Sequence, residues 1–196
     1  PIVKESNKVL RGKAKEVPVR EIPTPHIQLL ISQMKETLKN TPDGVGLAAP
    51  QIGEPLRIFI VSEEAEEIDK AEKHGWKRRK KENLAEKNPS FAKATEGNEK
   101  PYETREWKYH VFINPAVQNK SKKKLEGPEG CLSVPGKYGT VKRYEKITIR
   151  AYDGRGEKFI RGASRFFARV MQHELDHLDG TLFIDKAEKL IETSKS

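Results

Sequence analysis

The sequence predicts an α+β fold in one domain, with mainly antiparallel sheets packed around a central helix. Three observations lead to this class. Residues 110–115, 138–152 and 158–160 contain segments typical of strands, with the alternating polarity of half-buried antiparallel strands in 138–152. Residues 24–40 and 164–178 have the apolar periodicity of amphipathic helices. A length of 196 residues suits one ordinary domain, numbered 1–196, and is short for two.

The chain is basic, with a formal net charge of +9 and a sequence pI near 9.5. Such an excess favours loose contact with polyanions, and we expect a transient association with the ribosome through the basic surface. The single cysteine excludes an intramolecular disulfide and favours a reducing compartment. No apolar run reaches the roughly 20 residues that span a bilayer, and the first residues lack the apolar stretch of a signal peptide. We therefore expect a cytoplasmic monomer with no membrane partner.

The amino-terminal part predicts an arm followed by a helix. Residues 1–20 mix apolar and basic positions without periodicity and are expected to be extended. The helix begins after Thr24 as its N-cap, has Pro25 in the first helical position, and ends near Asn40 and Pro42. Its apolar stripe consists of Ile27, Leu30, Ile31, Met34 and Leu38.

A loop of small residues at 44–53 and a buried strand at 57–61 follow this helix. Gly44 and Gly46 flank Val45 in the loop, which predicts that the backbone there comes close to another group. Residues from about 62 to 108 are dominated by charges of both signs and contain few aliphatic side chains. Their composition is typical of an exposed, disordered insertion, within which we expect a charged helix from residue 63 to about residue 81.

The carboxyl-terminal half is predicted to form strands and then a helix. Strands are expected at 110–115, within 138–152 and at 158–160, with a hairpin turn at 153–156. The final helix is predicted from about Ser164 to Leu178, with Gly180 as its stop signal.

This final helix carries His173, Glu174 and His177. Histidines at positions i and i+4 lie on one face, so both imidazoles can reach a single ion. Glu174 can then act on a water that the ion activates, without being a ligand itself. The alternative is a pair of ordinary surface histidines. Phe166 and Val170 lie on the same stripe, however, so the histidines should face the interior, where unpaired imidazoles are costly.

A hydrolytic metal site needs a third protein ligand and one open position. In one group of proteases with this helix the third ligand is a downstream histidine, but that position is Phe183 here. In another group it is a downstream glutamate, but Glu188 and Glu192 lie within the final nine residues, too close to the end. Cys131 is the upstream candidate, in a segment whose glycines and prolines exclude a helix. As alternatives, Cys131 is a small buried hydrophobe, or a nucleophilic thiolate assisted by a histidine. The nucleophile reading leaves the paired histidines without a role.

Three segments resemble, in order, the three motifs of the peptide deformylase family. They are Gly44-Val45-Gly46-Leu47-Ala48-Ala49-Pro50-Gln51, Glu129-Gly130-Cys131-Leu132-Ser133 and Gln172-His173-Glu174-Leu175-Asp176-His177. The resemblance extends to about Asp185, apart from the insertion. It implies a metal-dependent hydrolase that removes the N-formyl group from the formyl-methionine terminus of nascent polypeptides and releases formate.

The resemblance also implies how the site residues divide the work. The metal ligands are Cys131, His173 and His177. Glu174 is the acid–base group, and the Gln51 amide with the backbone N–H of Leu132 forms an oxyanion hole. The residues assigned to substrate binding are Gly44, Val45, Gly46, Glu129, Phe166 and Val170. Within this set, the glycine-flanked backbone pairs with the peptide, and the three apolar side chains form the walls of the methionine pocket.

The cofactor is expected to be one divalent metal ion. A thiolate with two imidazoles suits Zn2+ by ligand softness, whereas the resemblance favours Fe2+ in vivo. Ni2+ and Co2+ suit the same ligands, so a crystal can contain any of these ions.

Three features depart from the family pattern. The insertion at about 62–108 is longer than the usual link, and Arg165 stands where many members have glycine. No clear match exists for the substrate-facing arginine after the second motif, for which Arg143 is the candidate.

Two other functions fit parts of the pattern. A zinc peptidase using the same helix would require a third ligand other than Cys131. A basic RNA- or ribosome-binding protein with a structural metal would have four protein ligands and no open position.

Overall fold

The computed structural model describes residues 1–41, 44–71 and 108–192. Its α-helices are α1 (Pro25–Lys39), a helix of which residues 64–71 are described, and α3 (Arg165–Leu178). Its 3₁₀ helices are η1 (Lys8–Arg11), η2 (Val19–Glu21), η3 (Ala49–Ile52) and η6 (Phe183–Asp185). Its strands are β1 (Gly46–Ala48), β2 (Ile58–Ser62), β3 (Tyr109–Lys120), β4 (Lys124–Cys131), β5 (Val134–Tyr144), β6 (Lys146–Tyr152), β7 (Lys158–Ser164) and β8 (Lys189–Glu192).

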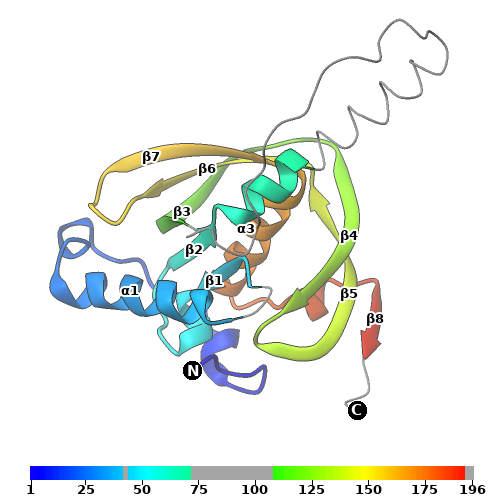
Figure 1. The fold of residues 1–196 in the computed structure, drawn as a ribbon, viewed down its shortest axis with the longest axis horizontal. Coiled ribbons are helices and arrows are strands. Elements are labelled where there is room, and N and C mark those ends of the chain that lie inside the picture. The colour runs from blue at the N-terminus through cyan, green and yellow to red at the C-terminus, as the bar shows by residue number, and fades with distance from the viewer. Residues whose placement is uncertain (42–43, 72–107, 193–196) are drawn as a thin grey trace, which may run out of the picture.

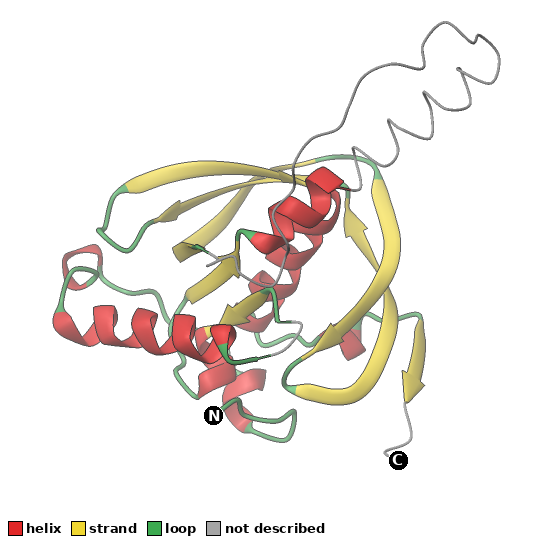
Figure 2. Cartoon of the chain, viewed as in Figure 1, coloured by secondary structure: helices red, strands yellow, loops and turns green. Residues whose placement is uncertain are grey.

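The strands form two antiparallel sheets on either side of α3 (Figure 1). The larger sheet has the order β1-β2-β3-β6-β7, and the smaller has the order β4-β5-β8. Coloured by secondary structure, α3 runs between the two groups of strands (Figure 2), and it contacts β1, β2, β6 and β7 as well as β5. The predicted α+β class with antiparallel sheets is confirmed. None of the described helices is long and apolar enough to cross a membrane.

Both faces of the larger sheet are buried at β2, which explains why β2 is a continuous apolar run. Phe59 and Val61 on one face pack into the core around α3, and Ile58 and Ile60 on the other pack into the core around α1. Alternate residues of a strand point to opposite faces, so a strand between two helices needs apolar side chains throughout.

Helix α1 has nearly the predicted bounds, and its five stripe residues are all buried. Thr24 is the N-cap by position, but its hydroxyl donates to the Glu21 carbonyl and makes no cap hydrogen bond to the helix. The first helical position is Pro25, whose missing N–H lessens the need for a cap at this end.

The amino-terminal arm is extended only in part. It contains η1, and Leu10, Ala14 and Val17 in it are buried. The backbone N–H of Val3 donates to the Gln51 carbonyl, and that of Glu5 donates to the Ser133 carbonyl. The arm therefore bridges the two segments that flank the functional cavity described below, which a sequence without periodicity could not show.

The start of the charged insertion is a helix that packs on α3. The described part, 64–71, agrees with the predicted charged helix, whereas residues 72–107 lie outside the described residues. Ala65 is fully buried, and Glu66 pairs with Arg161 of β7. The buried carboxylate of Asp69 accepts hydrogen bonds from the Phe166 backbone N–H at 2.8 Å and the Ser164 hydroxyl at 3.3 Å. Asp69 thus caps the amino terminus of α3 from outside that helix.

Replacing Asp69 with alanine is expected to lower the free energy of unfolding by about 1 kcal/mol, because the first turn of α3 loses an acceptor. The variant Asp69→Asn keeps an acceptor oxygen and should lose less than half of that. Urea unfolding at matched metal content measures both. Equal losses, or no loss in the alanine variant, would contradict the capping role.

Arg165 adopts a backbone conformation that favours glycine. Its φ angle is 49°, in the left-handed region, at the junction between β7 and α3. Asn114 has a similar φ of 50°, but its side chain bonds both the N–H and the carbonyl of Val17 and so fixes that geometry. For a residue with a Cβ, the left-handed region costs about 1–2 kcal/mol.

We expect Arg165→Gly to raise the free energy of unfolding by roughly 0.5–1 kcal/mol, because the released strain exceeds the extra freedom of an unfolded glycine. The matched control is Arg165→Ala, which removes the guanidinium but keeps the Cβ. Thermal unfolding compares the two. A gain in the alanine variant as large as that in the glycine variant would place the effect in the side chain and not in the backbone.

Candidate active site

A cavity of about 480 Å³ opens between α3, β1 and the β4–β5 hairpin. This volume is in the range of ordinary small-ligand sites. Nearly every residue that the sequence nominated lines it; the exception is His177, which lies beneath it. The lining includes Gly44, Val45, Gly46, Gln51, Glu129, Cys131, Leu132, Phe166, Val170, His173 and Glu174. Segments from all three motifs therefore meet in one place.

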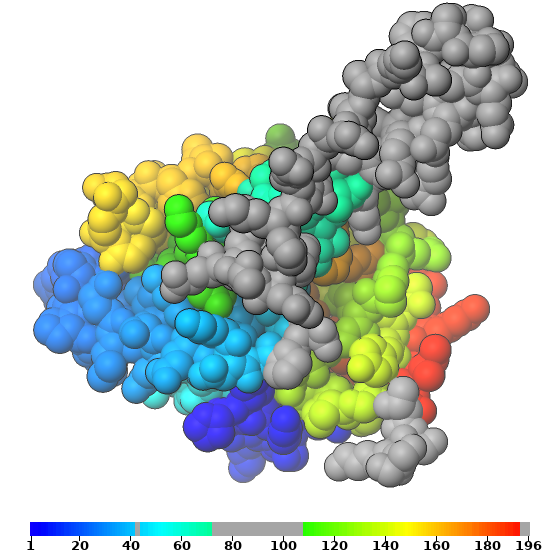
Figure 3. All heavy atoms as spheres, viewed as in Figure 1, coloured from blue at the N-terminus to red at the C-terminus, as the bar shows by residue number. Residues whose placement is uncertain are grey.

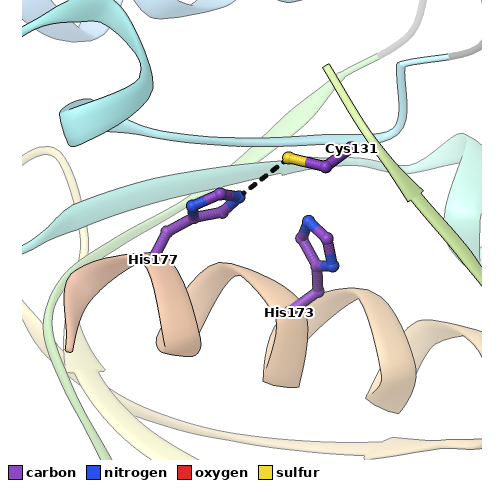
Figure 4. Close-up of side chains that lie close together, drawn as sticks. All are labelled: Cys131, His173 and His177. Carbon is purple, nitrogen blue, oxygen red and sulfur yellow. Dashed lines mark hydrogen bonds between the residues drawn. The ribbon is translucent and has the colours of Figure 1, made fainter. Parts of the chain in front are cut away.

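Cys131, His173 and His177 converge at the inner end of the cavity. One ligand atom from each lies within 4.8 Å of the others. The Cys131 Sγ is 3.2 Å from His177 Nε2, and the two imidazole rings stand edge to face with centroids 4.9 Å apart (Figure 4). The two histidines lie on the same face of α3 because they are four residues apart. The cysteine lies at the end of β4.

These donors fit a divalent cation. A thiolate with two imidazoles is a common ligand set for such ions, and a site with three protein ligands would keep a position for water or substrate. The pKa of His177 lies well below its usual value, because the ring is buried and the charge on His173 opposes a second one. For His173, burial opposes a charge, but the hydrogen bonds with Cys131 and Glu129 outweigh it and raise the pKa to about 10 without an ion. A cation binding there would have to displace that proton, because a neutral imidazole is the form that binds a metal. Among the described residues, no group hydrogen-bonds to the buried Nδ1 of His177.

The other nitrogen of His173 is held by a buried carboxylate. His173 Nδ1 is 3.1 Å from Glu129 Oε2, so Nε2 is the atom left for an ion. Arg143 reaches both oxygens of Glu129 at 2.8 Å, and Arg169 reaches Oε1 at 2.8 Å. Burial opposes a charge on Glu129, but the hydrogen bonds from Arg143 and His173 outweigh it and lower its pKa to about 2.

Arg143 does not face the cavity. Its side chain is only 5% exposed and also binds Asp176 on α3, which in turn binds Lys186 at 2.6 Å. The expectation that Arg143 is the substrate-facing arginine is therefore wrong. A guanidinium with two carboxylate partners is stabilised in the interior, whereas a substrate-facing one would need exposure.

Glu174 points into the same cavity and is 3% exposed. Burial raises its pKa to about 7 in the absence of an ion. Its Oε2 is buried, with no hydrogen-bond partner among the described residues. Burying such an atom costs free energy unless water or a ligand supplies a hydrogen-bond partner.

Gly46 is required beside this carboxylate. A Cβ at Gly46 would lie 2.5 Å from Glu174 Oε1 and 2.9 Å from Val170 Cγ1. At Gly44 it would lie 2.9 Å from Leu38 Cδ1. The predicted close approach of the glycine-flanked loop is confirmed, and the nearest group to Gly46 is the glutamate of the final helix.

The Gln51 amide is fixed in orientation. Its Oε1 accepts from the Ala48 N–H at 2.8 Å, so its Nε2 points toward Cys131 Sγ at 3.6 Å and Ser133 Oγ at 3.4 Å. Leu132 and Ser133 form the tight turn between β4 and β5, so the Leu132 backbone lies beside the same sulfur. The amide is 1% exposed, so its direction is set by these contacts.

Comparison with known proteins agrees with this geometry. A family model described as polypeptide deformylase matches residues 1–192. The chain belongs to this family.

Relatives within the polypeptide deformylase family match most of the chain. A peptide deformylase from Syntrophomonas wolfei is 36% identical over 186 residues, which are 95% of this chain and 91% of the relative. The chloroplastic/mitochondrial peptide deformylase 1A from Arabidopsis thaliana is 39% identical over 185 residues. That match covers 94% of this chain but only 60% of the length of the relative. Likewise, the chain spans only 58% of the length of the chloroplastic peptide deformylase 1A from Solanum lycopersicum.

Solved structures of the family share the fold. A Met-Ala-Ser-bound crystal structure of class I type b peptide deformylase from Acinetobacter baumannii has a TM-score of 0.69 with 28% identity. The match covers 95% of this chain and 96% of that one.

Arg169 is a residue that sequence reasoning missed. It is 9% exposed and donates to Glu129 and to the carbonyls of Leu125, Gly127 and Val141. The only available signal was its place near the apolar stripe of the final helix. A buried arginine cannot be assigned from its own helix, because all its partners lie on β4 and β5.

Replacing Glu129 with glutamine is expected to weaken metal binding by 10–100-fold, because His173 loses a charged acceptor and two guanidiniums lose a counter-charge. The matched control is Glu126→Gln on the same strand, whose carboxylate is half exposed and pairs with Lys142. Competition with a chelator measures both affinities. Equal affinities in the two variants would contradict a positioning role for Glu129.

Proposed function

We propose that this protein is a peptide deformylase, which hydrolyses the N-formyl group from the formyl-methionine terminus of nascent polypeptides and releases formate. One observation carries the proposal: a buried carboxylate with an unpartnered oxygen and an oriented amide face the same Cys-His-His cluster within one cavity. The family supports the same activity. A structural metal site would enclose its ion with four protein ligands and would need neither group.

The metal would be held by Cys131, His173 and His177. A divalent cation there supplies Lewis acidity, which makes water nucleophilic near neutral pH. We propose Fe2+ as the ion in vivo, on the family resemblance, and Zn2+, Ni2+ or Co2+ as substitutes with the same ligands. His173 is aligned for this by Glu129, for which we propose a positioning role in place of the expected substrate contact.

Glu174 is proposed as the acid–base group. It accepts the proton of the attacking water and returns it to the leaving amine, so one carboxyl serves both halves of the reaction. Its burial supports this role, because a carboxyl whose pKa is near neutrality can both take and give a proton. A cation beside Glu174 lowers that pKa and favours the form that accepts a proton.

The Gln51 Nε2 and the Leu132 N–H are proposed to donate to the oxygen that becomes negative when the formyl carbon is attacked. Removing one such donor costs about 2.7–4 kcal/mol of transition-state stabilisation in other hydrolases. The bond from Ala48 to Oε1 supports the role of Gln51, because it keeps the two N–H groups of the amide on the cavity side.

The substrate backbone is proposed to pair with residues 44–46. Strand β1 is the edge of the larger sheet, and an edge accepts an added strand. The methionine side chain would contact Val45, Phe166 and Val170, which form an apolar wall of the cavity. The bound Met-Ala-Ser of the Acinetobacter baumannii relative supports a peptide of this kind as ligand.

We infer that the protein acts in the cytoplasm as a monomer and meets its substrates at the ribosome. Lysines at the β3–β4 turn support the last point, because Lys120, Lys122, Lys123 and Lys124 concentrate positive charge at one end of the molecule. Phosphate groups of RNA would complement such a cluster.

The decisive measurement is formate release from formyl-Met-Ala-Ser by the metal-loaded protein. We expect Glu174→Gln to retain the metal while turnover falls by about 10²–10⁴-fold. The variant Cys131→Ala should lose the metal. The control Glu188→Gln, at an exposed glutamate, should keep both metal and turnover.

Each rival predicts another outcome. Retention of metal and activity by Cys131→Ala would remove the cysteine from the ligand set. An absence of formate release from the metal-loaded native protein would overturn the proposed activity. Turnover by Glu174→Gln at the native rate would remove Glu174 from the mechanism.

A further inference from the structure

Two large apolar side chains stand exposed beside the cavity. Tyr138 of β5 is 52% exposed and Ile191 of β8 is 64% exposed. They face each other across the β5–β8 pair, and directly opposed residues of an antiparallel pair project from the same face of the sheet. Figure 3 shows β8, in red, lying against the yellow-green surface of the β4–β5 hairpin.

The Tyr138 ring connects this surface to the cavity. Tyr138 pairs with Gly130 of β4, and a Cβ at Gly130 would lie 3.0 Å from Cδ1 and from Cε1 of the ring. The ring therefore lies across the backbone of Gly130, one residue before Cys131. Both Gly130 and Tyr138 line the cavity. The apolar surface thus begins at the rim of the site and continues outward to Ile191.

The fold does not account for this exposure. The residues on either side of Tyr138 in β5 contact groups within the protein: the Lys137 ammonium binds Glu5 at 2.9 Å, and Gly139 packs against Ala187 and Phe183. The Tyr138 side chain, by contrast, stays exposed. The proposed chemistry does not use the ring either, because the formyl group belongs at the Cys-His-His cluster and the methionine side chain at the Val45 wall. The part of the substrate left to contact a surface at the rim is therefore the peptide that follows the methionine.

We propose that Tyr138 and Ile191 form a shelf that binds an apolar side chain from one of the two residues following the formylated methionine. This inference rests on the proposed deformylase function, which it deepens by adding a sequence preference. The shelf carries no charge of its own, so apolar and aromatic side chains gain most from covering it. Because it does not touch the reacting atoms, its contribution should appear in KM and not in kcat.

The test compares formyl-Met-Ala-Phe and formyl-Met-Phe-Ala with formyl-Met-Ala-Ala. We expect at least one phenylalanine peptide to exceed formyl-Met-Ala-Ala about fivefold in kcat/KM, as suits one aromatic contact. The variant Tyr138→Ala should remove that preference through KM. Tyr138→Phe should keep the preference, and Ile191→Ala should reduce it.

The matched control is Ile160→Ala on β7, because Ile160 is 62% exposed and does not line the cavity. It should leave the preference unchanged. A native protein without the preference, or an equal loss on all three peptides in Tyr138→Ala, would overturn the proposal.

A binding measurement tests the shelf independently of the proposed deformylase activity. Calorimetry with Met-Ala-Phe, Met-Phe-Ala and Met-Ala-Ala requires no turnover. If formate is never released, the proposed function fails, and the shelf is then judged by these peptides alone. Equal dissociation constants for all three on the native protein would overturn the shelf even where formate release is confirmed.

Discussion

The site depends on one buried carboxylate, that of Glu129. It lies between two guanidiniums and an imidazole, and these partners come from both β5 and α3. An isolated charge at this depth would cost several kcal/mol, but here every formal charge has an opposite neighbour and directed hydrogen bonds. The network therefore fixes how α3 sits against the hairpin that carries Cys131. Removing Glu129 would leave Arg169 without its carboxylate partner and Arg143 with one carboxylate in place of two.

The chemistry of the cavity follows from that placement. Since α3 is held against the hairpin on one side and β1 on the other, Glu174 is pressed against Gly46 and excluded from solvent. The Gln51 amide is held in turn by Ala48 and faces the sulfur. The amino-terminal arm holds the surrounding segments, since its backbone N–H groups donate to the carbonyls of Gln51, Ser133 and, at the end of α3, Leu178. Pre-organised groups of this kind need little rearrangement during a reaction.

Two of the three departures of this chain from the family pattern, the insertion and Arg165, meet at one junction. Arg165 takes a left-handed conformation where a glycine would be unstrained, and Asp69 caps the helix immediately beyond it. The first turn of α3 is thus strained by one residue and stabilised by another from the charged insertion. The two contributions are of similar size, about 1 kcal/mol each, and opposite in sign.

The sequence by itself predicted α1, α3 and several of the strands, and it nominated the candidate site residues. Apolar periodicity located α1 and α3, alternation located parts of β5, β6 and β7, and the spacing of His173 and His177 indicated a shared ion, because these signals are local. It did not predict β1, β4 or β8. It could not assign Arg143 or Arg169, or foresee that Asp69 caps α3, since each of these depends on partners far away in the chain. The Gln51 role came from family resemblance, and its orientation came from the fold. Only the tertiary structure decided which buried charges pair and which side chains reach the rim, because pairing is set by the packing of α3 between two sheets.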